Sequence, residues 1–371
     1  MIMKRERIIA LILALLMMFT LCACGNDAPA STPADKPAAD APADKPAADA
    51  PAEEPKDDTV YTFSFASPDG EESLRHIYIE KPFMDYITEK SEGRIQFTYF
   101  PSGSLANTGA ILDGCKNGVC DFGIDAPTFY PGVYLYNELL GTPGVNIGST
   151  YEEKQANLSA YNEAYVAPEL AKDAHVLANF VTLNTYILTN KEINGVADFA
   201  QENLATSANF FPVYAAMGAS TSAVNYGESY ESLRLGVIDM IQAGYGIINN
   251  FRLYEVTNYA YFNPTTVSNS VMFVSNDAYN SLPDDLKAIV DEAGKMIENE
   301  FNYGFVDANE AIVGDAVAAG NPDFAWCELP AEVLDTMAAS AEQILADKVA
   351  ELNAAGLDGD GALALLQSFG K

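Results

Sequence analysis

The strongest constraint on the fold is a short segment that occurs twice along the chain, at residues 112–124 and 230–242. The two copies share a basic residue, a glycine, a valine and an aspartate, at Lys116/Arg234, Gly118/Gly236, Val119/Val237 and Asp121/Asp239. A basic residue suits the negative end of a helix dipole, and a glycine that follows it ends the helix in the left-handed conformation. The apolar run after the glycine predicts a buried strand.

Two copies of this helix–glycine–strand unit indicate two similar α/β lobes. A cleft between such lobes, at the carboxyl ends of their strands, is where ligands usually bind. Joints of this kind also occur in any α/β protein. The repeat alone therefore leaves both interpretations open.

The net charge of the chain argues against some classes of binding partner. The formal net charge is −32 over 371 residues, which argues against nucleic acid or an anionic membrane surface as the main partner. A bound anion would need a local cation, because the field of the protein repels it. The length suffices for two domains, and 49% of the residues are apolar, so a large core can form.

The first residues predict export. A basic start is followed by an apolar run at 8–21, which is too short for a comfortable transmembrane helix. Leu-Cys-Ala-Cys at 21–24 is typical of a bacterial lipobox, so we expect a signal peptide at 1–23 and a lipid on Cys24. A diacylated cysteine would give stable anchoring. The alternative is an ordinary secretory signal with a chance cysteine.

Residues 24–58 are predicted to be the lipidated cysteine and a disordered tether. Asp-Lys-Pro-Ala-Ala-Asp-Ala-Pro-Ala occurs at 35–43 and again at 44–52, and this composition prevents packing. We expect an exported monomer on the outer face of the cytoplasmic membrane, or in the periplasm. It would touch the membrane only through its lipid.

The three remaining cysteines are Cys115, Cys120 and Cys327. The first two flank the helix–glycine joint at core-facing positions, which indicates buried thiols or, in an exported protein, a local disulfide. Their spacing does not suit a common zinc site, and the only histidines, His76 and His175, add no cluster. We therefore expect no metal and no cofactor.

Strand and helix patterns alternate from residue 60 onward. Strands are predicted at 60–67, 94–100, 119–124, 176–189, 203–207 and 271–275. Helices are predicted at 72–90, before Gly118, and at about 151–173, 196–201, 210–218, 284–319, 330–354 and 361–368. The β-α-β-α-β start is typical of a doubly wound α/β fold.

Eight short segments keep a fixed order over 59–371. They are 83–95, Tyr99-Phe100-Pro101-Ser102-Gly103-Ser104-Leu105, 118–121, 189–199, Met217-Gly218-Ala219-Ser220, 228–239, Tyr254-Glu255-Val256 and Leu282-Pro283-Asp284-Asp285-Leu286. In this order and spacing they resemble the solute-binding receptors of TRAP (tripartite ATP-independent periplasmic) transporters.

The resemblance implies a two-lobed, periplasmic-binding-protein-like α/β fold with crossing strands and a long bridging helix. It also implies that the chain closes on a small organic ligand, docks on a TRAP-type membrane permease and is not an enzyme. We place lobe I at 59–184 plus 270–310, and lobe II at 185–269 plus 311–371.

The resemblance also locates a ligand site, and here the sequence departs from the family. Members usually carry an arginine in the strand that matches 203–207, and its guanidinium pairs with the ligand carboxylate. Ala205 occupies that position in this chain. A buried carboxylate without a cation is costly. We therefore expect a ligand that is neutral, cationic or held by an unfamiliar cation.

Seven residues are our candidates for contact with the ligand. They are Ser67, Asp125, Thr185, Asn209, Tyr226, Gln242 and Tyr245. Asp125 fits an amine or a hydroxyl-rich ligand, or else caps a loop. The two tyrosines either stack on a ring or pack within a lobe, and Asn209 is either a donor or an ordinary loop residue. Three basic residues could replace the missing arginine as the cation of the site, or else have structural roles: Arg75, His76 and Arg252.

Two other functions fit a chain of this kind. The first is a two-lobed receptor for an ATP-driven importer or a sensor kinase, and a permease or kinase encoded beside it would distinguish these. The second is a secreted enzyme. The sequence shows no nucleophile elbow, no metal-ligand cluster and only two histidines, which argues against an enzyme.

Overall fold

The computed structural model describes residues 59–182, 184–265 and 267–369, which belong to one compact unit. The predicted signal peptide, the lipid on Cys24 and the tether at 24–58 lie outside the described residues. Within the described ranges, none of the helices has the length and apolar character that crossing a membrane requires.

The first of two sheets has five strands in the order β2-β1-β3-β10-β4. They are β1 (Tyr61–Ala66), β2 (Ile95–Phe100), β3 (Phe122–Asp125), β4 (Ala174–Val181) and β10 (Asn269–Ser275). β1 pairs with β2 and β3 in parallel, whereas β10 runs antiparallel to β3 and β4. Along β10, Val271 and Phe273 face one core cluster while Met272 and Val274 face the other. Every residue of this strand is buried, and its central residues 271–274 are apolar, because helices cover both of its faces.

The helices of the first sheet form two layers. They are η1 (His76–Glu80), α2 (Lys81–Lys90), α3 (Ile111–Lys116), η2 (Pro127–Phe129), α4 (Leu135–Leu140), α5 (Tyr151–Tyr161), η3 (Asn162–Val166), α6 (Ala167–Leu170), α10 (Asn276–Ser281) and α11 (Asp284–Met296). α2 and α11 pack on one face, and α3 to α6 contribute to the core on the other.

The second sheet has six strands in the order β11-β9-β5-β8-β6-β7. They are β5 (Thr185–Thr189), β6 (Asn203–Thr206), β7 (Ser220–Ala223), β8 (Met240–Gly244), β9 (Tyr259–Asn263) and β11 (Ala325–Glu328). β5 runs antiparallel to β8 and β9, and the remaining pairs are parallel. The helices nearby are η4 (Val196–Phe199), η5 (Ala208–Phe210), α7 (Phe211–Ala216), α8 (Tyr226–Arg234), α9 (Tyr245–Asn250) and η6 (Leu253–Glu255).

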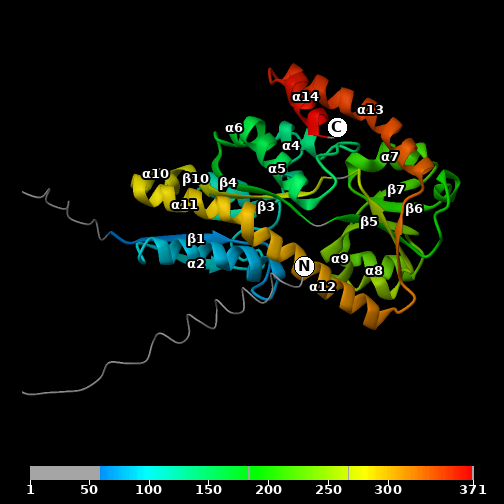
Figure 1. The fold of residues 1–371 in the computed structure, drawn as a ribbon, viewed down its shortest axis with the longest axis horizontal. Helices are drawn as coiled ribbons and strands as arrows, with labels where there is room; N and C mark the ends of the chain where they lie inside the picture. The colour runs from blue at the N-terminus through cyan, green and yellow to red at the C-terminus, as the bar shows by residue number, and fades with distance from the viewer. Residues whose placement is uncertain (1–58, 183, 266, 370–371) are drawn as a thin grey trace, which may run out of the picture. The chain divides into compact units, whose positions relative to one another are not determined.

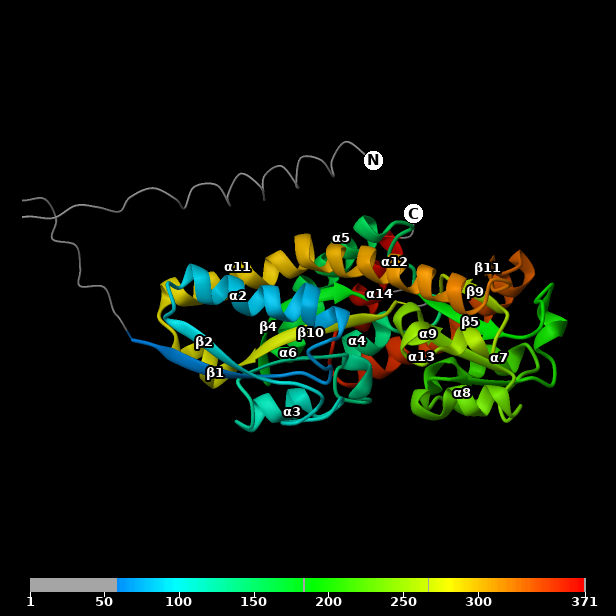
Figure 2. The same ribbon diagram turned by 90° about the horizontal axis from the view of Figure 1, so that it is seen from below.

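The chain crosses between the sheets through short connections. β4 in the first sheet leads into β5 in the second, and β9 in the second leads back into β10 in the first (Figures 1 and 2). The sequence predicts a single strand at 176–189. The structure divides that range into β4 and β5. The sequence carries no sign of the break, because residues 182–184 include no glycine or proline.

One long helical segment spans both sheets. It consists of α11, the π-helical turn η7 (Ile297–Phe301) and α12 (Asn302–Gly320). α11 packs on α2 and β4, and α12 packs on α9 of the second sheet (Figure 2). The predicted helix at 284–319 is therefore confirmed with a π turn in its middle. Crossing strands and this helix match the predicted two-lobed fold.

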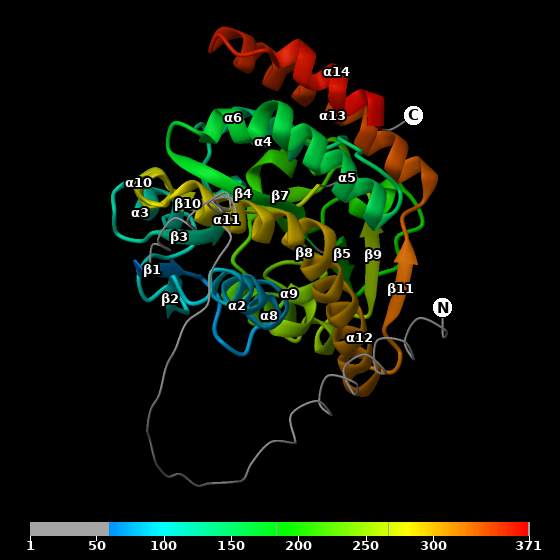
Figure 3. The same ribbon diagram turned by 60° about the vertical axis from the view of Figure 1, so that its left-hand side comes forward.

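The C-terminal helices pack on helices of both sheets. α13 (Ala331–Ala354) packs on α7 and on α4, and α14 (Gly359–Phe369) packs on α4 and α5 (Figures 1 and 3). Our boundaries place 311–371 in lobe II, whereas Ala362 and Leu366 of α14 are buried in a core cluster of the first sheet. The lobe boundaries stay a prediction.

Both copies of the repeated segment end a helix as predicted. Gly118 has φ +73° and Gly236 has φ +68°, in the region that favours glycine. The expected strand start is wrong in both copies, because β3 begins only at Phe122 and β8 only at Met240. The valines between glycine and strand lie at the surface, with exposed fractions of 50% and 62%.

The aspartates of the repeat make the same contact in each sheet. Asp121 Oδ2 accepts a hydrogen bond from the backbone N–H of Ser64 at 2.8 Å, and Asp239 Oδ2 accepts one from Asn203 N–H at 2.8 Å. Ser64 lies in β1 and Asn203 begins β6, each a neighbouring strand of its sheet. Each carboxylate thus links the segment before one strand to the backbone of another.

The two buried cysteines of the first copy lie side by side. Cys115 and Cys120 are free thiols with their sulfur atoms 3.3 Å apart. This arrangement corresponds to the buried-thiol alternative.

The N-terminus of α4 depends on a distant carboxylate. Glu169 accepts hydrogen bonds from the backbone N–H groups of Leu135 at 2.7 Å and Tyr136 at 3.1 Å. These N–H groups have no partner inside the helix. Burial outweighs these hydrogen bonds and raises the pKa of Glu169 from its ordinary 4.5 to about 7.

We predict that replacing Asp121 with alanine lowers the free energy of unfolding by about 1.5–3 kcal/mol, the range for hydrogen bonds to charged groups. Chemical denaturation of the purified protein measures this change. Asp113 is an exposed acid on α3, so Asp113→Ala is the matched control. It should lower the free energy of unfolding by less than about 1 kcal/mol. Equal effects of the two substitutions would contradict the assigned role of Asp121.

We predict a pH dependence of stability from Glu169. Between its ordinary pKa of 4.5 and about 7, the folded protein holds a proton that the unfolded chain has lost. The stability that Glu169 contributes to the folded state is therefore fully present below pH 4.5, and it is lost as the pH rises to about 7. Glu169→Gln should gain stability relative to the wild type across this window in denaturation curves. Parallel pH profiles of the two proteins would refute the assignment.

Candidate ligand-binding site

Several strands end at one edge of each sheet. The parallel strands β1 and β3 end next to Ser67 and at Asp125, and the parallel strands β6 and β8 end at Thr206 and Gly244. Ligands of open α/β sheets bind outside the carboxyl ends of strands. These two edges therefore form the candidate site.

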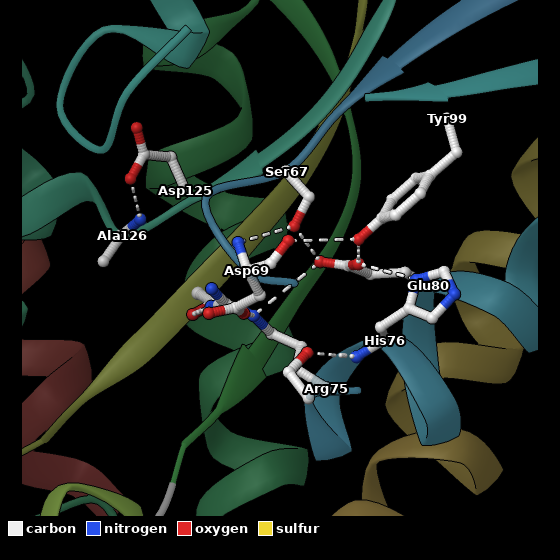
Figure 4. A network of polar contacts seen from close by, with 10 residues as sticks. Ser67, Asp69, Arg75, His76, Glu80, Tyr99, Asp125 and Ala126 are labelled. Atoms are coloured by element: carbon white, nitrogen blue, oxygen red, sulfur yellow. Dashed lines mark hydrogen bonds and ion pairs between the residues drawn. The ribbon is translucent and has the colours of Figure 1, made fainter. Parts of the chain in front are cut away.

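A fully buried carboxylate organises the edge of the first sheet. Glu80 of η1 accepts hydrogen bonds from Ser67 Oγ at 2.7 Å and Tyr99 OH at 2.6 Å, and its Oε2 lies 3.3 Å from His76 Nδ1 (Figure 4). Ser67 is itself completely buried and also accepts the N–H of Asp69 at 3.0 Å. Ser67 is thus committed to internal bonds, and His76 is a structural partner of Glu80.

Arg75 is the cation at this edge. Its Nε pairs with Asp69 and lies 3.8 Å from Glu80, while its Nη1 lies 3.5 Å from Ser270 Oγ of β10. Burial lowers the pKa of Arg75, but the carboxylates of Asp69, Glu80 and Asp125 outweigh burial and raise it. The guanidinium is therefore fully charged and already compensated by acids.

Asp125 is buried at the end of β3. Its carboxylate accepts hydrogen bonds from Gly109 N–H at 2.9 Å, Ala126 N–H at 2.9 Å and Tyr130 OH at 2.7 Å. Burial raises the pKa of Asp125, while these three donors and the charge of Arg75 oppose the increase. The contacts are those expected of a loop-capping acid, the structural alternative for this residue.

Gln242 organises the edge of the second sheet. Its Oε1 accepts hydrogen bonds from Thr206 Oγ1 at 2.6 Å and Tyr214 OH at 3.0 Å. Asn263 Nδ2 donates to the same Tyr214 hydroxyl at 3.2 Å. This network joins β6, β8, β9 and α7, and it places uncharged polar groups at this edge.

Two further candidate residues of the second sheet are Tyr226 and Thr185. Tyr226 OH donates to the backbone carbonyl of Gln242 at 3.3 Å. Burial raises the pKa of Tyr226 to about 12. Thr185 begins β5 opposite Gly244 and Asn263. Tyr226 and Gln242 are therefore in contact, whereas Thr185 lies opposite Gly244, two residues further along β8.

The position of the missing arginine is an apolar core site. Ala205 is buried in β6 opposite Ile241, in a cluster with Leu188 and Ile248. Arg252, another candidate cation, has an exposed side chain that pairs with Glu255 at 2.6 Å. Among the three candidate cations, only Arg75 and His76 lie at a sheet edge.

Asn209 links the two sheets. It lies in η5 after β6, and its Nδ2 donates to the carbonyl of Gly141, the residue that ends α4, at 3.0 Å. This contact joins an element of the second sheet to a helix of the first. Asn209 is therefore at the boundary between them.

A cavity of about 410 Å³ lies beside these edges. Elements of both sheets line it, from the start of α5 and the crossing residues Thr182 and Asn184 to β5, α9 and β11. Tyr245 lines it, whereas the other six candidate residues do not. Sequence reasoning missed Lys154 and Trp326 in its wall, because neither lies near a segment of the resemblance.

Comparison with known proteins identifies relatives along most of the chain. The family model described as bacterial extracellular solute-binding protein, family 7 (DctP), matches residues 65–351. The ectoine-binding periplasmic protein TeaA of Halomonas elongata is 21% identical over 237 residues, which are 62% of this chain and 67% of that protein. The ectoine/5-hydroxyectoine-binding periplasmic protein UehA of Ruegeria pomeroyi is 22% identical over 240 residues, 62% of this chain and 69% of that protein.

Solved structures share the fold. A TRAP periplasmic solute-binding protein of Ochrobactrum anthropi superposes with a TM-score of 0.74 at 19% identity, covering 84% of this chain and 96% of that one. A TRAP solute-binding protein of Rhodoferax ferrireducens with copurified benzoate gives 0.71 at 22% identity, covering 84% and 97%.

Proposed function

The chain belongs to the bacterial extracellular solute-binding proteins of family 7, and we propose that it holds its solute between the carboxyl edges of its two sheets. Proteins of this family are receptors for TRAP-type transporters and form a non-enzymatic class. The proposal concerns where this chain binds its solute, which solutes it takes and how it is anchored.

The observation that carries the proposal is the short crossing between two polar edges. β4 ends at Val181 in the first sheet and β5 begins at Thr185 in the second. A connection of this length spans at most about 14 Å. It therefore keeps the edge with Ser67, Arg75 and Asp125 close to the other sheet, as a binding cleft requires.

The charges of the two edges bear on the class of solute. The arginine position of the family is the buried Ala205, and Arg75 at the opposite edge already faces Asp69, Glu80 and Asp125. A simple carboxylate would find no uncompensated cation among these groups. We infer that the solute in this cleft is neutral or cationic and forms hydrogen bonds.

The proposed ligand contacts are Thr185, Asn209, Tyr226, Gln242 and Tyr245, while Ser67 and Asp125 are proposed to position the edge of the first sheet through their internal bonds. TeaA and UehA are named for binding ectoine, and the Rhodoferax ferrireducens structure holds benzoate. These names support a small organic molecule as the solute. A TRAP-type permease is the proposed membrane partner, with the receptor acting as a monomer.

We further propose that the mature chain begins at a lipidated Cys24 and is held on the outer face of the cytoplasmic membrane. The lipobox-like segment at 21–24 supports this proposal. Intact-mass measurement of the membrane fraction should show a chain that starts at Cys24 with added acyl groups. Cys24→Ala should release the protein from that fraction, and unchanged membrane retention would contradict lipid anchoring.

A thermal-shift screen of the purified protein against acids, amines, sugars and nucleosides tests the proposed solute class. A solute at 100 times its Kd should stabilise the native state by about 2.7 kcal/mol. We expect the largest shifts from neutral or cationic compounds. If simple carboxylates give the only strong shifts, the inference from Ala205 is wrong.

Two variants test the proposed contacts with the same screen. Gln242→Ala and Tyr226→Leu should abolish the shift caused by the solute, while the variants still unfold cooperatively. Tyr230→Leu is the matched control, because Tyr230 lies on the same helix α8 and its hydroxyl bonds Glu255 instead. Unchanged affinity in both Gln242 and Tyr226 variants would refute this site.

A further inference from the structure

The cavity of about 410 Å³ has a size typical of small-molecule sites. It lies between the start of α5, β5, β9, β11 and α12. Only Tyr245 belongs both to its wall and to the contacts proposed above. The remaining residues of its wall have no role in the proposed cleft.

Aromatic rings form one wall of the cavity. Tyr245 and Trp326 are stacked with ring centroids 5.0 Å apart, and Tyr186 meets Trp326 edge-on at 5.0 Å. Trp326 is 39% exposed although it is a large apolar side chain. An exposed stack of this kind offers ring faces on which an organic group can pack.

Lys154 provides a cation at another part of the wall. Its Nζ lies 3.5 Å from Asn184 Oδ1 and 5.8 Å from the ring centroid of Phe262. Within the described part of the chain, no carboxylate forms an ion pair with it. Burial lowers the pKa of Lys154, because a desolvated ammonium without a counter-ion is costly. A ligand carboxylate would supply that counter-ion.

Two exposed acids lie on the side of the tyrosines. Glu310 of α12 and Glu328 at the end of β11 line the cavity. Burial and the charges of Tyr245, Glu310 and Glu328 raise the pKa of Tyr186 to about 12. Tyr245 OH donates to the backbone carbonyl of Glu310 at 3.5 Å, and Glu328 follows Trp326 by two residues on β11, so both acids lie on the side of the aromatic stack. The cavity thus has a cationic side and an acidic, aromatic side.

We propose that this cavity is a second ligand site, which binds a zwitterion with a carboxylate and an ammonium group, such as an amino acid or a betaine. The carboxylate pairs with Lys154. The ammonium packs on Tyr245 and Trp326 beside Glu310 and Glu328, where ring faces and carboxylates both attract a cation.

The charge arrangement selects against simpler ligands. A carboxylate without an ammonium group meets Glu310, Glu328 and a net charge of −32 on the whole chain. An ammonium without a carboxylate leaves Lys154 unpaired and lies in the same cavity as its charge. Only a ligand with both charges satisfies both sides.

Fluorescence of Trp326, the single tryptophan of the chain, reports on this cavity directly. Titration of the purified protein uses two zwitterions of different size, glycine betaine and L-phenylalanine. Each is compared with its charged parts: tetramethylammonium and acetate for the first, phenethylamine and phenylacetate for the second. At least one zwitterion should change the fluorescence saturably, at concentrations at least tenfold lower than its parts require. No saturable change with either zwitterion, or equal binding of the parts, would overturn the proposal.

Lys154→Met tests the cationic side. It should weaken binding of the zwitterion at least tenfold and leave binding of the matching ammonium compound unchanged or tighter. Lys90→Met is the matched control, because Lys90 lies over the Tyr86 ring at 5.4 Å on the distant helix α2. Calorimetric titration repeats the measurement without relying on Trp326, and thermal unfolding checks that both variants fold. Equal zwitterion affinity in the two variants would refute the role of Lys154.

Discussion

One hydrogen bond, made once in each sheet, sets the geometry on which the rest of the structure depends. An aspartate three residues after a helix-ending glycine accepts a backbone N–H from another strand, from Ser64 to Asp121 and from Asn203 to Asp239. Because this bond ties the start of β3 or β8 to the backbone of the parallel strand beside it, the carboxyl ends of the two strands come to a common edge. The candidate site occupies those edges.

The crossing strands turn two similar sheets into one receptor. Each edge carries its own internal polar network, around Glu80 in the first sheet and around Gln242 in the second. Internal bonds of this kind hold side chains in place before a solute arrives, which lowers the entropy cost of binding. From Ala205 and the acids around Arg75 we infer a preference for solutes other than simple carboxylates.

The sequence predicts the elements with a strong local signal and misses contacts made only in the folded chain. The glycines at 118 and 236 and the periodicity of 284–319 identify helix ends and the bridging helix correctly. The short strands β9 and β11 and the helix α4 carry no comparable pattern. Seven site candidates follow from the resemblance, but Ser67 and Asp125 prove to be occupied by internal bonds. Lys154 and Trp326 lie far apart in sequence, so only tertiary structure brings them to one cavity.

The central claim is that a solute binds between the two sheet edges and draws them together. Small-angle X-ray scattering of the protein, with and without the solute that stabilises it most, measures this directly. The account predicts that the solute lowers the radius of gyration of the wild type. It predicts no change in the radius of the Gln242→Ala variant under the same conditions. If the wild type has the same radius of gyration with and without saturating solute, the central claim is wrong.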